Sequence, residues 1–298
     1  MIRLGFGPEH PYGHASHGTR AAVEGFGRAD VADLHARLYR QRGSLLALVA
    51  DDDPRSLLDQ ARGVLARGQW PAAAPLLPER PFPACEGPPA PLRALAIHKP
   101  DSTQAQVRIV APGVPRNTPR HAEAVVANSA LGGGFTSLLV DAIRVDRGLS
   151  YSVSTRLLMY RRAGLALFSS FTRNETLREL IDLALEKMRG YAAAGPAPEA
   201  LQKARTYLAG LFPFGLESHE SLAEQVADAI LDGLGVDHLR DYRDRVLAVT
   251  PEAARAAAAE LSPARPGAQI VVVGDGETAR SALADLCPVE VRQLEEFA

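Results

Sequence analysis

The chain has 298 residues, of which 46% are hydrophobic and 23% charged, and its formal net charge is −2. These values are typical of a soluble globular protein with one large domain or two medium ones. The near-neutral charge provides no field that would favour nucleic acid or an anionic membrane surface. No run of about 18 apolar residues occurs, so we expect no membrane-spanning helix. We expect a soluble protein, cytoplasmic or periplasmic, but no targeting signal is visible and the compartment stays unknown.

The first part of the chain combines helical patterns with one apolar run. Helices are predicted over 19–25, 29–41 and 55–67, the last with Pro54 at its first turn. Residues 44–50 (SLLALVA) predict a buried strand between two of these helices. The stretch 71–91 is rich in proline and predicts an extended linker between domains.

A second unit begins near residue 92 and combines strand pairs with a long run of helices. Strands are predicted over 94–99, 104–111, 151–160, 163–172 and 269–274. Helices are predicted over 119–131, 136–145, 176–194, 198–211, 218–234, 236–247, 251–261 and 277–286. Antiparallel strand pairs with segregated helices indicate an α+β architecture.

Two segments share one pattern. Residues 29–67 and 250–286 each predict a helix, a buried strand and a second helix, with Asp51 and Asp275 at equivalent places. We infer a duplicated domain, with the end of a truncated first copy at 1–70, a linker at 71–91 and a complete second copy at 92–298. On this interpretation, more than about 100 residues of the first copy are missing before Met1.

The segment 143–151 (IRVDRGLSY) is the most informative for function. Arg144 falls in the last turn of a predicted helix, Gly148 ends that helix, and Tyr151 begins the next strand. A short turn would bring the guanidinium near the phenol, and such donors can hold a peptide carbonyl or stabilise an oxyanion. The residues alone leave open that Arg144 caps the helix while Tyr151 packs in the core.

Three stretches stand out by their order and spacing. They are ANSALGGGFTSLL (127–139) followed by Arg144 and RGLSY (147–151), FGPEHPYG (6–13) followed by GT (18–19), and QIVVVGD (269–275). Together they resemble the pitrilysin/insulinase family of zinc metallopeptidases, which includes the mitochondrial processing peptidases. The resemblance spans nearly the whole chain.

The resemblance implies a peptidase whose two halves close around an inner chamber. In such enzymes an HxxEH helix and a later glutamate of the first domain bind zinc, and an Arg–Tyr pair of the other half, here Arg144 and Tyr151, contacts the peptide. HxxEH does not occur in this sequence. We therefore expect no hydrolysis by this chain alone and no cofactor on it, with zinc expected only in a missing first-domain segment or a partner chain.

Partners expected from the resemblance are an extended peptide and either a zinc-bearing peptidase subunit or a second copy of this chain. The alternative is an inactive scaffold or protein-binding homologue with no role in proteolysis. Candidate residues lining the chamber are Gly132, Gly133, Gly134, Phe135, Phe212 and Phe214. The bland interpretations are a flexible junction between helices for the glycines, and a kink with core aromatics for the two phenylalanines. No Lys-Ser/Thr follows the glycines, which argues against a phosphate-binding loop.

Three histidines near the N-terminus could suggest a metal site. His10, His14 and His17 have helical spacing. Pro11 and Gly13 would break a helix there, so we expect a loop rather than a zinc site.

Overall fold

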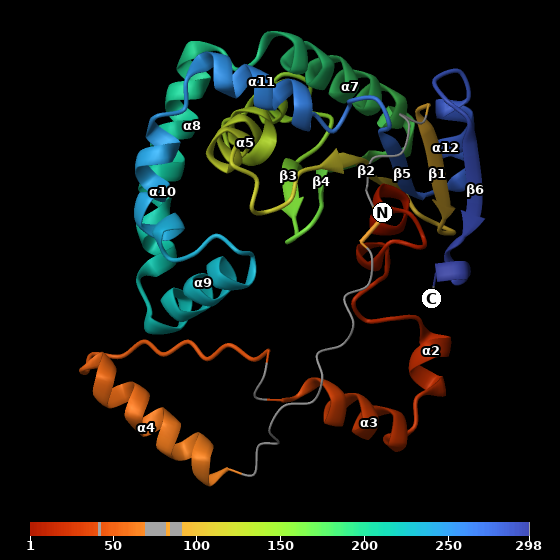
Figure 1. Cartoon of the computed structure of the whole chain (residues 1–298). Coiled ribbons are helices and arrows are strands. Elements are labelled where there is room, and N and C mark those ends of the chain that lie inside the picture. Colours follow the sequence, from red (N-terminus) through yellow and green to blue (C-terminus); the bar gives the residue numbers. More distant parts are fainter. Residues whose placement is uncertain (41–42, 69–81, 84–90, 298) are drawn as a thin grey trace. The chain divides into compact units, whose positions relative to one another are not determined.

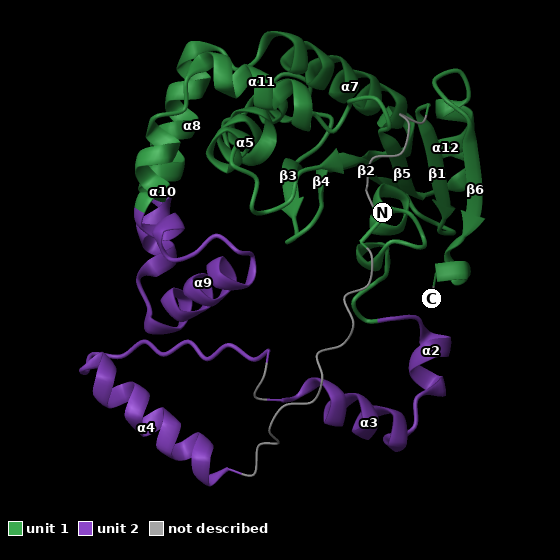
Figure 2. Cartoon of the chain, viewed as in Figure 1, with its two compact units in different colours: residues 1–17, 82–210, 241–298 green, residues 18–81, 211–240 purple. Residues whose placement is uncertain are grey.

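The computed structural model describes residues 1–40, 43–68, 82–83 and 91–297 (Figure 1). Figure 2 shows two compact units. The first comprises Met1–His17, Phe82–Gly210 and Asp241–Ala298, and the second comprises Gly18–Pro81 and Leu211–Arg240. This division groups the N-terminal residues with the main unit. The predicted linker 71–91 lies almost entirely outside the described residues and stays a prediction.

The first unit is built on a mixed sheet. Its strands are β1 (Arg93–His98), β2 (Gln104–Gly113), β3 (Val153–Met159), β4 (Gly164–Arg173), β5 (Gln269–Gly274) and β6 (Val289–Gln293), in the order β3-β4-β2-β5-β1-β6. β1 runs parallel to β5 and β6, and the other neighbouring strands are antiparallel. The strand β6 was not predicted, because its short, half-polar sequence VEVRQ lies at an edge and is mostly exposed.

Helices of the first unit lie over the sheet, and all of them except α1 were predicted from the apolar patterns. They are α1 (Ile2–Phe6), α5 (His121–Asn128), α6 (Leu138–Val140), α7 (Leu177–Ala194), α11 (Pro251–Leu261) and α12 (Gly276–Leu283), while α8 (Pro198–Leu211) and α10 (Asp237–Leu247) run across the division between the units. In α7, Leu180, Ala184 and Met188 recur every fourth residue and are fully buried. This stripe faces the main core, as expected for an amphipathic helix.

Both faces of β2 carry buried side chains. Val107 and Ile109 belong to the main core with α7, whereas Val110 belongs to a smaller core that includes Phe6 of α1. By length and composition the helical stretch His121–Val145 could cross a membrane, but 61% of its apolar window is buried inside the protein. The core helix of a soluble protein has the same properties, so this stretch is weak evidence for a membrane span.

The regular elements of the second unit are helices in the part of it that the structure describes. It contains α2 (Arg20–Gly25), α3 (Arg28–Leu38), α4 (Pro54–Arg67) and α9 (His219–Leu231), with a 3-10 turn over Phe212–Leu216. The strand predicted over 44–50 is wrong, because these residues form no strand and Leu46 is 56% exposed. A strand needs neighbouring backbone to pair its N–H and C=O groups, and the described residues offer this segment none.

The proposed duplication is not confirmed. Without a strand at 44–50, the first segment lacks the middle element of the repeat. The equivalence of Asp51 and Asp275 also fails, because the aspartate that caps the helix of that segment is Asp53, which accepts the Ser56 N–H at 2.8 Å. In the other segment, Asp275 itself caps α12 by accepting the Thr278 N–H at 2.7 Å.

Candidate functional site

Arg144 lies in a π-helical turn, Asp141–Val145, that continues α6. Neighbouring Ile143 is fully buried in the main core and anchors the turn, while Arg144 itself is only partly buried. The chain then reverses at Gly148, whose φ of +60° favours glycine, and the Leu149 N–H donates to the Ile143 carbonyl at 3.0 Å. This reversal returns Tyr151 to Arg144. Single π-helical turns occur often at functional sites.

The Arg144 guanidinium contacts two aromatic rings. Its Cζ atom is 4.4 Å from the ring centroid of Tyr151 and 5.0 Å from that of Phe135, both within the range of cation–π attraction. The two rings are 74% and 77% exposed, so neither packs in the core. Within the described part of the chain no carboxylate pairs with Arg144. The guanidinium is therefore held by the two rings, and no carboxylate of the described residues accepts its N–H donors.

Buried hydroxyls of β4 fix the backbone on both sides of Tyr151. Thr172 Oγ1 donates to the Leu149 carbonyl at 2.8 Å, and Ser170 Oγ donates to the Ser152 carbonyl at 2.9 Å. Both side chains are nearly inaccessible to solvent. The sequence analysis missed this support, although hydroxyl residues two positions apart share one face of a strand.

The glycine-rich turn is fitted closely against β3. Asn128 Nδ2 donates to the Thr155 carbonyl at 3.2 Å, and Thr155 Oγ1 donates to the Asn128 carbonyl at 3.3 Å. The π-helical turn Ser129–Gly133 follows, and a Cβ on Gly132 would lie 2.8 Å from the Thr155 side chain and 3.0 Å from its backbone nitrogen. Gly132 thus permits a close approach, while Gly133 is exposed. The turn is a packed junction rather than the flexible one expected.

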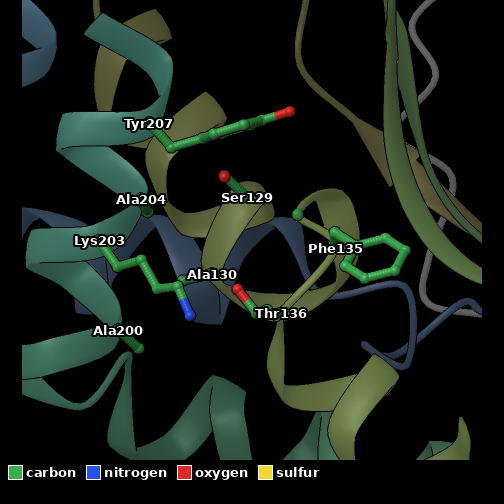
Figure 3. A pocket seen from close by; sticks show the side chains of 9 residues that line it. Ser129, Ala130, Phe135, Thr136, Ala200, Lys203, Ala204 and Tyr207 are labelled. Atoms are coloured by element: carbon green, nitrogen blue, oxygen red, sulfur yellow. The ribbon is translucent and has the colours of Figure 1, made fainter. Parts of the chain in front are cut away.

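A cavity of about 110 Å³ adjoins this turn (Figure 3). Its lining comprises Ser129, Ala130, Gly134, Phe135, Thr136, Ala200, Lys203, Ala204 and Tyr207. Of the predicted lining residues, Gly134 and Phe135 border this cavity. Lys203 and Tyr207 are four residues apart on α8 and reach the cavity from the opposite side. The sequence analysis did not single out these two residues.

Residues 25–208, which include the whole of this site, match the family described as the peptidase M16 inactive domain. The match covers more than half of the sequence. The chain belongs to this family. The resemblance to pitrilysin-type peptidases without the zinc motif is therefore confirmed.

Relatives of this M16 inactive domain are described as zinc proteases. An uncharacterized zinc protease of Mycobacterium leprae is 26% identical over 271 residues, covering 88% of this chain and 58% of the relative. One from Streptomyces coelicolor is 28% identical over 171 residues, covering 56% of this chain and 37% of the relative. The chain thus spans well under two thirds of the length of these relatives.

Solved structures show the same fold. The crystal structure of a peptidase M16 inactive domain from Pseudomonas fluorescens has a TM-score of 0.77 and 25% identity, covering 92% of this chain and 64% of that one. A protease from Helicobacter pylori has a TM-score of 0.73 at 17% identity, covering 89% and 63%. At 17% identity, the similarity to the Helicobacter pylori protease supports a shared fold only.

The remaining candidate residues of this M16 domain lie away from the Arg144 cluster in sequence. Phe212 and Phe214 belong to the second unit, where Phe214 is 71% exposed, so it is not the core aromatic of the bland interpretation. Their predicted place on a chamber wall stays a prediction.

The histidines form no helix-aligned set. His10 is buried, its Nδ1 accepts the Tyr12 N–H at 3.0 Å, and its ring stacks on Phe6. Burial lowers the pKa of His10, which keeps Nδ1 free to accept that hydrogen bond. The described ranges contain no group of three His, Cys, Asp or Glu side chains able to hold a metal.

Proposed function

We propose that this M16 inactive domain holds extended peptide substrates for a zinc-dependent endopeptidase and does not hydrolyse them by itself. The observation that carries the proposal is the Arg144 guanidinium, which lies over two exposed rings and has no carboxylate partner among the described residues. The guanidinium carries a permanent charge and a planar fork of N–H donors, and no carboxylate of the described residues occupies that fork. A peptide carbonyl oxygen is an acceptor that suits this fork.

The rings of Tyr151 and Phe135 also restrict the conformations that the Arg144 side chain can adopt. A long arginine side chain loses considerable rotamer freedom when it binds a ligand. Contact with these rings restricts that freedom before binding, and hydroxyls of β4 fix the backbone on both sides of Tyr151, so the cost of binding is lowered. The exposed Tyr151 phenol supplies a further donor beside the guanidinium.

Hydrolysis requires chemistry that these residues do not supply. HxxEH is not in the sequence, and the described residues contain no cluster that fits zinc. We therefore assign the metal and its activated water to a zinc-bearing first-domain segment or to a partner peptidase chain. In the complete enzyme, a donor aimed at the developing oxyanion is worth about 10²–10³ in rate, and Arg144 is the donor that we assign to this role.

Features of the second unit support association with a partner. The helices α3 and α4 have no buried residue, and Val31 and Val64 on them are 61% and 60% exposed. Apolar side chains that the described residues leave uncovered can be buried against another protein. The partner that we propose is a zinc-bearing peptidase chain.

Turnover in the complete enzyme tests this function. A zinc-bearing M16 peptidase chain that co-purifies with this protein would be reconstituted with it, and cleavage of an unstructured fluorogenic peptide followed. We expect Arg144→Ala and Tyr151→Phe each to lower kcat/KM at least about tenfold. Arg147→Ala is the matched control, because Arg147 is exposed and pairs with Glu179 rather than with the rings. Equal turnover by all variants would contradict the proposal and favour the scaffold alternative.

A further inference from the structure

Among the described residues, the only charged side chain that lines the cavity beside Phe135 is positive. The lining contains one cationic side chain, Lys203, and no aspartate or glutamate. In the described part of the chain no carboxylate pairs with Lys203. Hydroxyl groups of Ser129, Thr136 and Tyr207 supply further hydrogen-bond donors on the cavity wall.

The walls of the cavity are set by the fold. On α8, Leu201 and Ala204 are buried, while Lys203 and Tyr207 line the cavity from the solvent-exposed side of the helix (Figure 3). Small side chains at Ala200 and Ala204 leave room between α8 and Ala130. The volume of about 110 Å³ is below the range of about 300–1,000 Å³ that small-molecule ligands occupy, so the cavity suits a single side chain or chain end.

Phe135 connects this cavity with the Arg144 cluster. Its ring centroid lies 5.0 Å from the Arg144 Cζ atom, and Phe135 is also one of the residues that line the cavity. A peptide held by Arg144 and Tyr151 therefore passes next to the cavity mouth. The group best matched to one unpaired ammonium and several hydroxyl donors is a carboxylate, which accepts hydrogen bonds only.

We infer that this cavity is a subsite for a peptide carboxylate, recognised by Lys203 with the hydroxyl of Thr136. The inference rests on the proposed function, since it concerns the same bound peptide. The carboxylate belongs either to an acidic side chain or to the C-terminus of the peptide. In both cases its charge is held by Lys203 while Arg144 holds a backbone carbonyl.

Binding of matched peptides to the full chain tests this subsite. Fluorescence anisotropy would compare unstructured labelled peptides that carry Glu or Gln at one scanned position, each with a free or an amidated C-terminus. We expect the carboxylate-bearing member of one pair to bind about two- to fivefold more tightly, the range of an exposed ion pair. A Glu–Gln difference identifies the side chain as the source, and an acid–amide difference identifies the C-terminus.

Variants of the lysine separate this subsite from general charge attraction. Lys203→Met should abolish the difference, Lys203→Arg should retain it, and Lys99→Met, which removes an equal charge from an exposed residue at the end of β1, should leave it unchanged. Circular dichroism would verify that each variant is folded. Equal binding of both members of every pair, or a difference that persists in Lys203→Met, would overturn the inference.

The neutral amidated peptide distinguishes the two proposals. If Arg144→Ala weakens its binding while the carboxylate has no effect, the subsite is refuted and the proposed function stands. If Arg144→Ala does not weaken its binding, the proposed function itself fails. Failure of every peptide to bind would overturn both.

Discussion

Replacing Gly132 by alanine should destabilise the domain, although the glycine lies in a helical turn where alanine normally has the better propensity. The added Cβ would lie 2.8 Å from Thr155 Cγ2 and Oγ1 and 3.0 Å from the Thr155 backbone nitrogen. Thr155 is 1% exposed, and its hydroxyl is bonded to the Asn128 carbonyl, so it cannot rotate away without losing that bond. The strand backbone cannot move without disturbing its pairing with β4.

The size of the effect follows from these contacts. Forcing a methyl group into a packed interior costs about 1–3 kcal/mol, and breaking the hydrogen bond from the Thr155 hydroxyl to the Asn128 carbonyl adds about 0.5–1.5 kcal/mol. Alanine regains at most about 1 kcal/mol of helix propensity. We therefore expect Gly132→Ala to lower the free energy of unfolding by about 1–3 kcal/mol.

Urea unfolding followed by circular dichroism measures this change. The matched control is Gly190→Ala, in the interior of α7, where an added Cβ would meet nothing within 4 Å. That substitution should stabilise the protein by about 0.5–1 kcal/mol, so the two glycines should respond with opposite sign. An unfolding midpoint for Gly132→Ala equal to or above that of the unmodified protein would refute the close-packing argument.

Three further predictions concern buried polar groups and the corrected strand. Burial lowers the pKa of His10 in the folded protein, so as the pH falls the unfolded chain binds a proton at this residue first. The free energy of unfolding should therefore decrease as the pH drops through about 6.5. His10→Asn should flatten this pH dependence in thermal unfolding between about pH 5 and 8. Tyr191→Phe removes the donor to the Ala127 carbonyl and should cost about 1 kcal/mol in urea unfolding. Burial raises the pKa of Tyr191, so the unmodified protein should lose stability above pH about 10 more steeply than this variant. Leu46→Ser should change the unfolding free energy by less than about 0.5 kcal/mol, whereas a loss above about 2 kcal/mol would indicate the buried strand after all.

The strands show where sequence reasoning succeeds and where it fails. The apolar runs at 44–50 and 269–274 look alike locally, and both predicted buried strands. The second is β5, which lies between β1 and β2 and has its backbone paired on both sides. The first has no such neighbours among the described residues. Local pattern indicates that a segment can form a strand, while distant parts of the chain decide whether it does.

The same distinction applies to the site. The pairing of Arg144 with Tyr151 could be predicted, because the two residues are only seven positions apart and a glycine-containing turn between them brings them together locally. The contact with Phe135 and the cavity below it depend on how the glycine-rich turn and α8 pack, and α8 lies about 60 residues further along the chain. Lys203 and Tyr207 carry no motif in the sequence, and only their shared helix face could have indicated a role together.

The affinity of this chain for an unstructured peptide is the measurement that bears most directly on the Arg144 cluster. Titration by fluorescence anisotropy would compare the unmodified protein with Arg144→Ala, Arg144→Lys and the control Arg147→Ala. We expect both Arg144 variants to weaken binding, alanine at least about tenfold, because lysine keeps the charge but lacks the planar fork. Arg147→Ala should stay within about twofold. Equal affinities for all four proteins would contradict the assignment of Arg144 and Tyr151 to peptide binding.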